Sequence, residues 1–387
     1  MRLAKTMGAV AAGAALTLGL AACGGSGAGG SGGGGGGGAA GNGDDDIKVG
    51  VAMPTQTYER WIQDGNNIKK GLEKLGYEAD LQFANDDIPT QTQQIDSMIT
   101  EGVDVLVIAS IDGTALSSQL EAAAAANIPV IAYDRLIRDS ENVDFYVTFD
   151  NYEVGVQQGT ALLRGLGLVD EKGEKTGEKG PFNIELFAGS PDDNNATFFW
   201  DGAMDTLKPF LDDGTLKVPS GQTKFDQAAT QRWEQETAQK RMENLLTSTY
   251  NGGEKLDGVL APADPLSRGI ITALKGAGMG PTLSDGLPVV TGQDAEIASV
   301  KLIEDDVQSS TIFKDTRKLA DEAVKAAQAF AEGNEPEAND TETYDNGVKV
   351  VPSYLLDFDT IFKDDIQSKL VDTDYYTADE IKKGQTD

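Results

Sequence analysis

The sequence predicts an α/β protein with two doubly wound lobes, each a mostly parallel sheet covered by helices on both faces. Along residues 44–387, short and continuously apolar runs alternate with amphipathic stretches, a pattern typical of parallel strands buried between helices. The alternation restarts near residue 150, so the strands fall into two groups. A chain of this length also exceeds what one hydrophobic core usually holds.

The first group contains five expected strands and three expected helices. The strands are expected at 47–53, 77–83, 105–109, 128–133 and 145–149, and the helices at 58–75, 90–101 and 114–126. Gly76 and Gly102 directly follow the first two helices, where glycine is common because it adopts the left-handed backbone that ends a helix.

The second group begins with a helix expected at 152–166. Strands are then expected at 183–188, 216–218, 258–261 and 288–291, with helices at 196–210, 227–247, 266–276 and 295–303. The charged, glycine-containing stretch 171–180 is expected to be a surface loop. A strand at 310–313, a helix at 315–331 and a strand-like run at 347–356 follow. These three additional elements are more than one simple sheet needs, which indicates that the chain crosses between the lobes more than once.

The N-terminus predicts export and lipid anchoring. Arg2 and Lys5 precede an apolar run at 7–22, which ends in small residues directly before Cys23, the only cysteine of the chain. This order is typical of a bacterial lipoprotein signal peptide at 1–22, with acyl chains attached to Cys23. Residues 24–43 contain 14 glycines, so 23–46 is expected to be the lipidated cysteine and a flexible tether.

Composition excludes several functions. Without residues 1–22, which hold two basic and no acidic residues, the charge is 30 − 63 = −33, and we find no basic patch for nucleic acid. The chain has no histidine, which removes histidine-based triads, histidine acid–base catalysis and most zinc chemistry. No phosphate-binding loop, dinucleotide fingerprint or calcium loop occurs, so we expect neither a metal nor a cofactor.

Polar and aromatic side chains follow the ends of the expected strands, where ligands bind in open parallel sheets. The candidates are Arg60, Asp134, Arg135, Asp193, Asn195, Phe198, Trp233, Asp264, Asp294 and Lys314. Carboxylates, amides and cations in near balance suit a neutral polyhydroxylated ligand, whose apolar face packs on aromatic rings. Each residue also has a plainer interpretation. The aspartates at 134, 193 and 264 can cap helices, the asparagine at 195 can shape a turn, Trp233 can be packed on a helix, and Arg60 and Lys314 can be surface charges.

Several motifs resemble those of one family. They are WIQDGNN at 61–67, VIASIDG at 107–113, IAYDRLIR at 131–138, GSPDDNNA at 189–196, GQDAE at 292–296 and TIFKDTR at 311–317. From residue 47 to about 376 the chain resembles the periplasmic monosaccharide-binding proteins of ABC importers, above all the multiple-sugar-binding type and next the xylose-binding proteins.

The resemblance implies a type I periplasmic-binding-protein fold with two Rossmann-like lobes joined by a three-segment hinge. The family's sugar-contacting positions fall on the candidates at 60, 134, 135, 193, 195, 233, 294 and 314. Phe198 and Phe199 match its phenylalanine-rich helix start. The stretch APADP at 261–265 departs from its relatives around Asp264. We expect one lobe to comprise 47–149 and 314–345 and the other 150–313 and 346–387.

The implied function is capture of monosaccharides such as glucose, xylose, arabinose or galactose by a non-enzymatic monomer. The sugar would pass to an ABC permease and its ATPase, and the lipid anchor predicts the outer face of a Gram-positive cell membrane. Two alternatives remain: a sugar-sensing subunit for a signalling kinase, and a secreted glycosidase with paired carboxylates. A repressor with the same lobes is rejected, because the signal and tether occupy the place of its DNA-binding helices.

Overall fold

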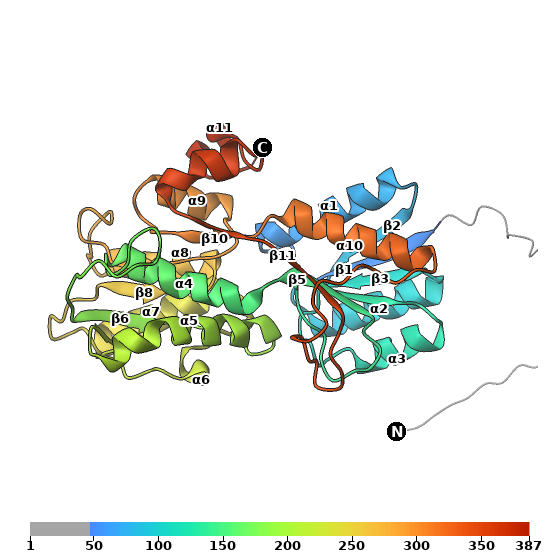
Figure 1. Cartoon of the computed structure of the whole chain (residues 1–387), viewed down its shortest axis with the longest axis horizontal. Helices are drawn as coiled ribbons and strands as arrows, with labels where there is room; N and C mark the ends of the chain where they lie inside the picture. The colour runs from blue at the N-terminus through green and yellow to red at the C-terminus, as the bar shows by residue number, and fades with distance from the viewer. Residues whose placement is uncertain (1–46, 387) are drawn as a thin grey trace, which may run out of the picture. The chain divides into compact units, whose positions relative to one another are not determined.

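The computed structural model describes residues 47–386, which form two α/β lobes (Figure 1). The predicted signal peptide, Cys23 and tether lie outside the described residues. The first lobe contains β1 (Lys48–Met53), α1 (Glu59–Lys74), β2 (Glu78–Phe83), α2 (Ile88–Glu101), β3 (Val105–Ile108), α3 (Ser117–Ala125), β4 (Val130–Tyr133), β5 (Phe145–Phe149), α10 (Thr316–Ala331) and β11 (Ser353–Leu356).

The sheet of the first lobe has the order β11-β5-β4-β3-β1-β2, and all of its pairs are parallel. Strands β3 and β4 are buried along their whole length, as expected for a sheet with helices on both faces. Helices α1 and α10 cover one face, and α2 and α3 cover the other (Figure 1). The continuous apolar runs in the sequence therefore have their origin in burial on two sides.

The second lobe contains the elements between β5 and α10 and the end of the chain. They are α4 (Asn151–Gly165), β6 (Phe182–Leu186), α5 (Asn194–Asp212), β7 (Leu216–Lys217), α6 (Phe225–Ala228), a 3₁₀ turn at Gln231–Trp233, α7 (Gln235–Ser248), β8 (Gly258–Leu260), α8 (Asp264–Gly276), β9 (Val289–Val290), α9 (Ile297–Glu304), β10 (Thr311–Phe313), β12 (Asp359–Ile361), short turns at Lys363–Asp365 and Gln367–Val371, and α11 (Ala378–Lys383).

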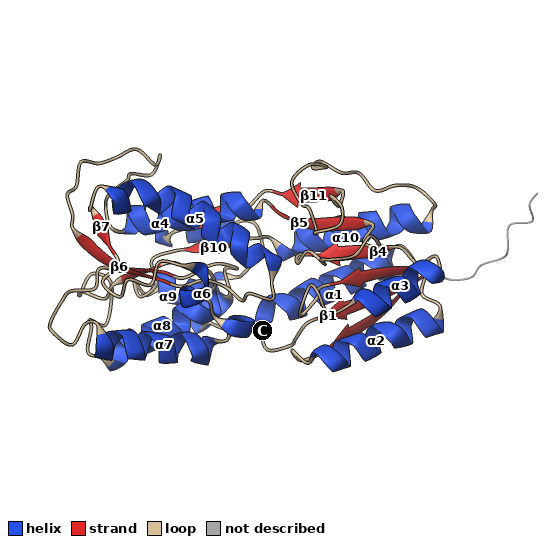
Figure 2. Ribbon diagram, turned by 90° about the horizontal axis from the view of Figure 1, so that it is seen from below, coloured by secondary structure: helices blue, strands red, loops and turns tan. Residues whose placement is uncertain are grey.

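The second sheet continues across one short gap. Strands β7-β6-β8-β9 are parallel, β10 and β12 are antiparallel, and a parallel bridge between Gln293 and Ile312 joins the two groups. Seen from below, the strands of each lobe lie between layers of helices (Figure 2). The sequence-based prediction of two doubly wound lobes is confirmed.

The chain passes between the lobes three times, as the resemblance implied. The first crossing lies between β5 and α4, the second between β10 and α10, and the third between β11 and β12. The boundary predicted for the second lobe is wrong at one place. The predicted boundary places residues 346–356 in the second lobe, but Ser353–Leu356 pairs with β5 in the first sheet, so the last crossing lies after Leu356.

The helix predicted at 227–247 is also wrong in its first third. Helix α6 ends at Ala228 and α7 begins at Gln235, because Arg232 and Trp233 adopt left-handed backbone with φ of 55° and 56°. Non-glycine residues rarely adopt this conformation, which interrupts a helix. As a result Trp233 lies in a tight turn rather than on a helix.

Candidate functional site

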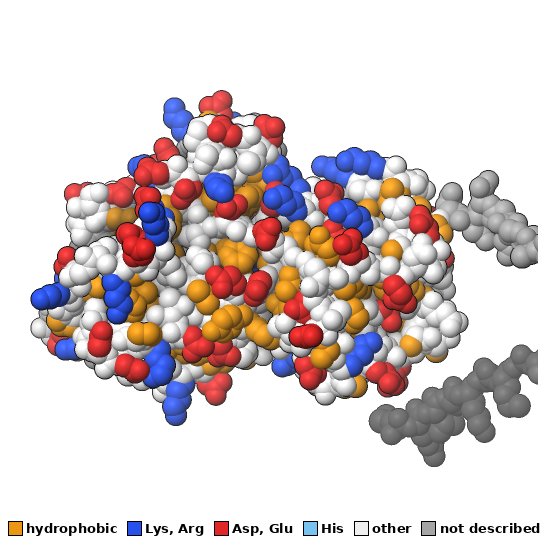
Figure 3. Space-filling view, viewed as in Figure 1, with side chains coloured by type: hydrophobic (Ala, Val, Ile, Leu, Met, Phe, Trp, Pro, Cys, Tyr) orange, Lys and Arg blue, Asp and Glu red, His pale blue; other side chains and the backbone are white. Residues whose placement is uncertain are grey.

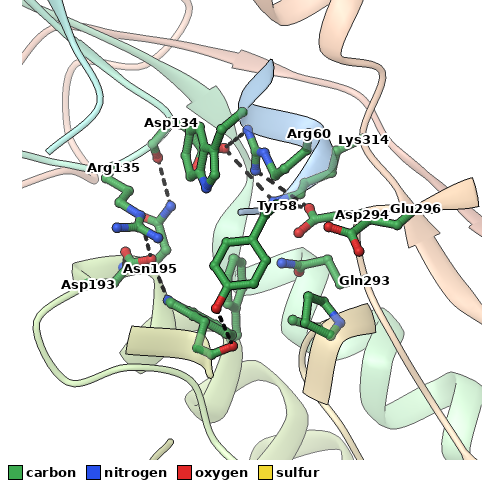
Figure 4. A pocket seen from close by; sticks show the side chains of 15 residues that line it. Tyr58, Arg60, Asp134, Arg135, Asp193, Asn195, Gln293, Asp294, Glu296 and Lys314 are labelled. Carbon is green, nitrogen blue, oxygen red and sulfur yellow. Dashed lines mark hydrogen bonds and ion pairs between the residues drawn. The ribbon is translucent and has the colours of Figure 1, made fainter. Parts of the chain in front are cut away.

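A cavity lies between the lobes at the carboxyl ends of the strands. Its lining consists of Tyr58, Arg60, Trp61, Asp134, Arg135, Asp193, Asn195, Phe199, Trp233, Ala263, Pro265, Gln293, Asp294, Glu296 and Lys314. Figure 4 shows Arg135, Asp193 and Asn195 on one side and Asp294, Glu296 and Lys314 on the other, with Tyr58 between them. The mixed polar and aromatic lining is that of a site for a small polar molecule.

Arg60, in the first turn of α1, is held between three carboxylates. Its Nε and Nη2 donate to Asp64 Oδ2 at 3.0 and 2.9 Å, and Nη2 lies 3.0 Å from Asp134 Oδ2. Nη1 lies 3.5 Å from Asp294 Oδ1 in the other lobe. Asp64 also accepts a short hydrogen bond from the Tyr133 hydroxyl. The guanidinium therefore has a fixed position in the cavity wall and pairs with two of the carboxylates that line it.

Lys314, at the second crossing, completes this charge network. Its Nζ lies 3.0 Å from Asp294 Oδ1 and 3.9 Å from Asp134 Oδ2. Burial by itself raises the pKa of Asp134, but Arg60, Lys314 and Arg135 together outweigh burial and hold that pKa below its usual range. Asp134 is therefore ionised at neutral pH, and a carboxylate in this state is a strong acceptor for a ligand hydroxyl.

A second polar group lies on the opposite side of the cavity. Arg135 Nε is 3.1 Å from Asp193 Oδ2, and the Trp233 indole donates to the same oxygen at 3.2 Å. Asp193 also caps α5, because its Oδ1 accepts from the Asn195 backbone N–H at 2.9 Å. Capping and cavity lining thus coexist in one side chain. Burial raises the pKa of Asp193, and the Arg135 charge opposes that rise.

Aromatic rings form the apolar part of the lining. Trp61, Phe199 and Trp233 all face the cavity, and the last two meet edge to face with their centroids 6.3 Å apart. The Trp233 ring lies directly over Gly189, three residues after β6, where a Cβ atom would overlap the ring. The glycine is therefore required for the tryptophan to enter the cavity wall.

Three lining residues have left-handed backbone. The φ angles are 60° at Asp134, 56° at Trp233 and 90° at Asp294. Such conformations are costly for side chains other than glycine and concentrate at functional sites, where the surrounding structure enforces them. All three lie where the chain leaves a strand or forms a turn and the side chain points into the cavity. The strained backbone is therefore associated with the orientation of these side chains.

The two lobes contact each other directly around the cavity. The Tyr58 hydroxyl donates to the Trp233 carbonyl at 3.1 Å, and the Asn195 amide donates to the Asp134 carbonyl at 2.7 Å. The Ile297 N–H donates to Glu59 Oε2 at 3.3 Å. These bonds join α1 and the β4 loop of one lobe to the turns of the other, so the structure is in a closed arrangement.

Eight of the ten predicted site residues line the cavity, and Phe198 and Asp264 do not. The Phe198 ring packs against Tyr344, with centroids 5.4 Å apart, and the neighbouring Phe199 faces the cavity instead. Asp264 is fully buried and accepts hydrogen bonds from the Glu296 N–H, the Gln308 amide and the Thr311 hydroxyl. It supports the loop after β9 and does not reach the cavity.

The sequence-based list omitted Tyr58, Trp61, Phe199, Gln293 and Glu296, all of which line the cavity. Four of them belong to or adjoin the sequence motifs that contain the predicted site residues. Trp61 follows Arg60, Phe199 follows Phe198, and Gln293 and Glu296 flank Asp294. Each motif is a short segment whose backbone turns at the cavity, so neighbours of the central residue can line the cavity as well. This rule identifies these four residues from the sequence.

The buried Asp264 predicts a pH dependence of stability. Burial raises the pKa of Asp264 from the usual 3.8 to about 8. Between these values the folded protein holds a proton that the unfolded chain releases, so the free energy of unfolding falls as pH rises, by up to about 1.4 kcal/mol per pH unit. Urea unfolding of the Asp264→Asn variant from pH 5 to 8 should lack this slope. The same slope in the wild type and the variant would contradict the assignment, and Asp212→Asn on the surface serves as the control.

Other types of site find little support in the described part of the chain. Residues 47–386 contain no group of three or more histidine, cysteine or acidic side chains able to hold a metal ion. On the face shown in Figure 3, basic and acidic side chains are interspersed and no broad basic area is visible. No helix among these residues is both long and apolar enough to cross a membrane.

Two lobes, three crossings and a polar cleft at the strand ends define a two-lobed solute-binding protein. The chain belongs to the periplasmic binding protein family, because the family described as "Periplasmic binding protein domain" matches residues 49–335. The predicted family and its type I fold are thereby confirmed.

Among relatives, the chain is 56% identical to the multiple sugar-binding periplasmic receptor ChvE of Rhizobium radiobacter, over 86% of this chain and 92% of that protein. It is 36% identical to the D-xylose-binding periplasmic protein of Escherichia coli (strain K12), over 87% and 93%. A solved ABC transporter solute binding protein from Clostridium phytofermentans with bound β-D-glucose superposes with a TM-score of 0.81 at 47% identity, covering 86% of this chain and 99% of that one. These relatives are binding proteins, which confirms that the chain is not an enzyme and sets the glycosidase alternative aside.

Proposed function

We propose that the protein captures aldose monosaccharides in the cleft between its lobes and delivers them to an ABC permease. The observation that carries the proposal is a pair of cation-held carboxylates, the buried Asp134 and the 13% exposed Asp294, next to aromatic rings in the cavity between the lobes. The names of the relatives, a multiple sugar-binding receptor and a D-xylose-binding protein, support it.

The lining matches the chemistry of a neutral sugar. Three cations, Arg60, Arg135 and Lys314, face four carboxylates, Asp134, Asp193, Asp294 and Glu296. A hydroxyl can donate to a carboxylate and accept from a guanidinium or ammonium group, and charge-assisted bonds of this kind are strong. The rings of Trp61, Phe199 and Trp233 offer flat surfaces to the C–H face of a pyranose. The near balance of charge disfavours ligands with a large net charge.

Closure follows from the position of these groups on both lobes. Asp134 and Arg135 follow β4 in the first lobe, whereas Asp193, Asn195 and Asp294 belong to the second. A ligand that contacts both sets binds the closed form better than the open form, and this difference in affinity drives hinge closure at the three crossings. The closed form is then the state that a permease would recognise.

A panel of monosaccharides tests the proposed function. Glucose, xylose, arabinose and galactose should each be tried in a thermal-shift assay, followed by calorimetry on those that raise the melting temperature. A ligand present at about a hundred times its Kd stabilises the folded protein by about 2.7 kcal/mol, which is readily seen as a shift. Amino acids serve as control ligands. Stabilisation by these controls and not by any monosaccharide would refute sugar binding.

The anchor at Cys23 is a further part of the proposal. The relatives are named periplasmic proteins, which supports export, but their names favour no Gram-positive envelope, so we propose only the outer side of the cytoplasmic membrane. We expect Cys23→Ser to move the protein from the membrane fraction to the soluble exported fraction, while sugar affinity is unchanged. Retention of the variant in the membrane fraction would rule out lipid anchoring.

A further inference from the structure

The loop that carries Asp294 is held by hydrogen bonds from several distant segments. Its backbone is left-handed at Asp294 and at Ala295, with φ of 90° and 48°. The Asp294 N–H donates to the Ile312 carbonyl at 2.8 Å, and the Ala295 N–H donates to the Thr311 hydroxyl at 3.1 Å. Strand β10 thus supports one side of the loop. A conformation this unfavourable persists only when neighbouring groups enforce it.

The other side of the loop is supported by the end of the chain. The Tyr376 hydroxyl donates to the Ala295 carbonyl at 3.1 Å, across 81 residues of sequence. Both groups are buried, Ala295 completely and Tyr376 to all but 4%. The Tyr376 ring packs with Ile297, Phe313 and other apolar residues of the second lobe, so its position does not depend on the hydroxyl.

The adjoining Tyr375 connects the same segment to the first lobe. Its hydroxyl donates to Gln63 Oε1 in α1 at 3.1 Å, and its ring meets Phe313, next to Lys314, edge to face at 4.6 Å. Residues 375–376 therefore contact the loop of Asp294, the strand before Lys314 and α1, which carries Arg60. In Figure 1 α11, near the chain end, lies over α9, on the side of the lobe that faces away from β6.

We propose that Tyr376 is a positioning residue of the binding site, which holds the Asp294–Ala295 backbone in its left-handed conformation and so directs the Asp294 carboxylate toward Lys314 and Arg60. Tyr376 does not line the cavity and acts through Asp294. The inference rests on the proposed function of the cleft but concerns a residue outside it. Without the hydroxyl, the Ala295 carbonyl is buried with one partner fewer, and the loop can relax toward ordinary backbone angles.

The test compares two tyrosine-to-phenylalanine variants in the second lobe. Tyr376→Phe should weaken the affinity for D-glucose, or for whichever monosaccharide binds best, by about five- to tenfold. Tyr250→Phe is the matched control, since the Tyr250 hydroxyl is also buried and donates to Glu185, away from the cavity. It should lower the melting temperature without changing affinity by more than about twofold.

A double-mutant cycle separates positioning from general destabilisation. In an Asp294→Asn background, Tyr376→Phe should have almost no further effect on affinity, measured by tryptophan fluorescence at millimolar sugar. In an Asp193→Asn background, on the opposite side of the cavity, it should retain its full effect. Equal effects of Tyr376→Phe in both backgrounds, or no effect in the wild-type background, would overturn the proposal.

Hydrogen exchange provides a measurement that needs no ligand. In the sugar-free protein, Tyr376→Phe should speed amide exchange across 294–297 by about tenfold and leave β8 unchanged, whereas Tyr250→Phe should not affect 294–297. If the wild-type protein binds no monosaccharide, the proposed function fails, and exchange alone then decides whether Tyr376 holds this loop. Unchanged exchange at 294–297 would show that it does not.

Discussion

Replacing Asp294 by alanine is expected to weaken monosaccharide binding by at least about a hundredfold. The substitution removes a hydroxyl acceptor from the cavity and takes away the partner that lies 3.0 Å from Lys314 Nζ. Lys314 is 3% exposed, so its ammonium group cannot regain water in the closed protein. The remaining carboxylate, Asp134, is 3.9 Å from the same nitrogen and is already held by Arg60.

Calorimetry with glucose, xylose, arabinose and galactose measures this effect. Asp212→Ala provides the control, because Asp212 pairs with Lys208 on the exposed surface of α5, and its loss should leave affinity unchanged. If Asp294→Ala binds each sugar as tightly as the wild type, Asp294 has no role in the site and the proposed arrangement of the ligand is wrong.

Replacing Arg60 by methionine should produce the largest loss of stability among the cleft residues. Asp64 and Asp134 are both buried and would lose the cation that lies within 3.0 Å of each. Removing one partner of a buried ion pair typically costs about 3–5 kcal/mol, because a charge remains without compensation. We expect the free energy of unfolding in urea to fall by about this amount at pH 8.

The loss should be smaller at pH 5. Burial raises the pKa of Asp64 from 3.8 to about 6 even with Arg60 opposing that rise, so without the guanidinium this carboxyl takes up a proton more readily still. Protonation removes the uncompensated charge. The difference in free energy of unfolding between the wild type and the variant should therefore be smaller at pH 5 than at pH 8. The double variant Arg60→Met, Asp64→Leu should recover part of the stability at pH 8 without recovering sugar binding. A pH-independent loss, or no recovery in the double variant, would contradict this account.

Much of the site was predictable because its side chains directly follow strands. Asp134 and Arg135 after β4, Asp193 and Asn195 after β6, and Asp294 after β9 all line the cavity, since the carboxyl ends of parallel strands meet at one edge of a sheet. The same reasoning was wrong for Asp264, which follows β8 but turns inward to accept three hydrogen bonds. Sequence position determines which edge of the sheet a residue reaches, and local packing determines which way its side chain points.

Adjacent residues on a helix show the same limit. Phe198 and Phe199 lie one position apart on α5 and therefore point about 100° apart, so only one can face the cavity. The sequence does not indicate which one, because both are phenylalanine. The choice depends on Tyr344, nearly 150 residues later, because the Phe198 ring packs against the Tyr344 ring and not toward the cavity.

The sequence by itself determined the order of most strands and helices up to residue 356, the two lobes and the polar and aromatic side chains available at the strand ends. It did so because burial on two faces imposes continuous apolar runs, and because strand ends are local features. Only the tertiary structure decided three other features: the pairing of β11 with β5, the turn that carries Trp233, and the hydrogen bond from Tyr376 to the Ala295 carbonyl next to Asp294. Each depends on contacts between distant segments or on a backbone angle that no local pattern specifies.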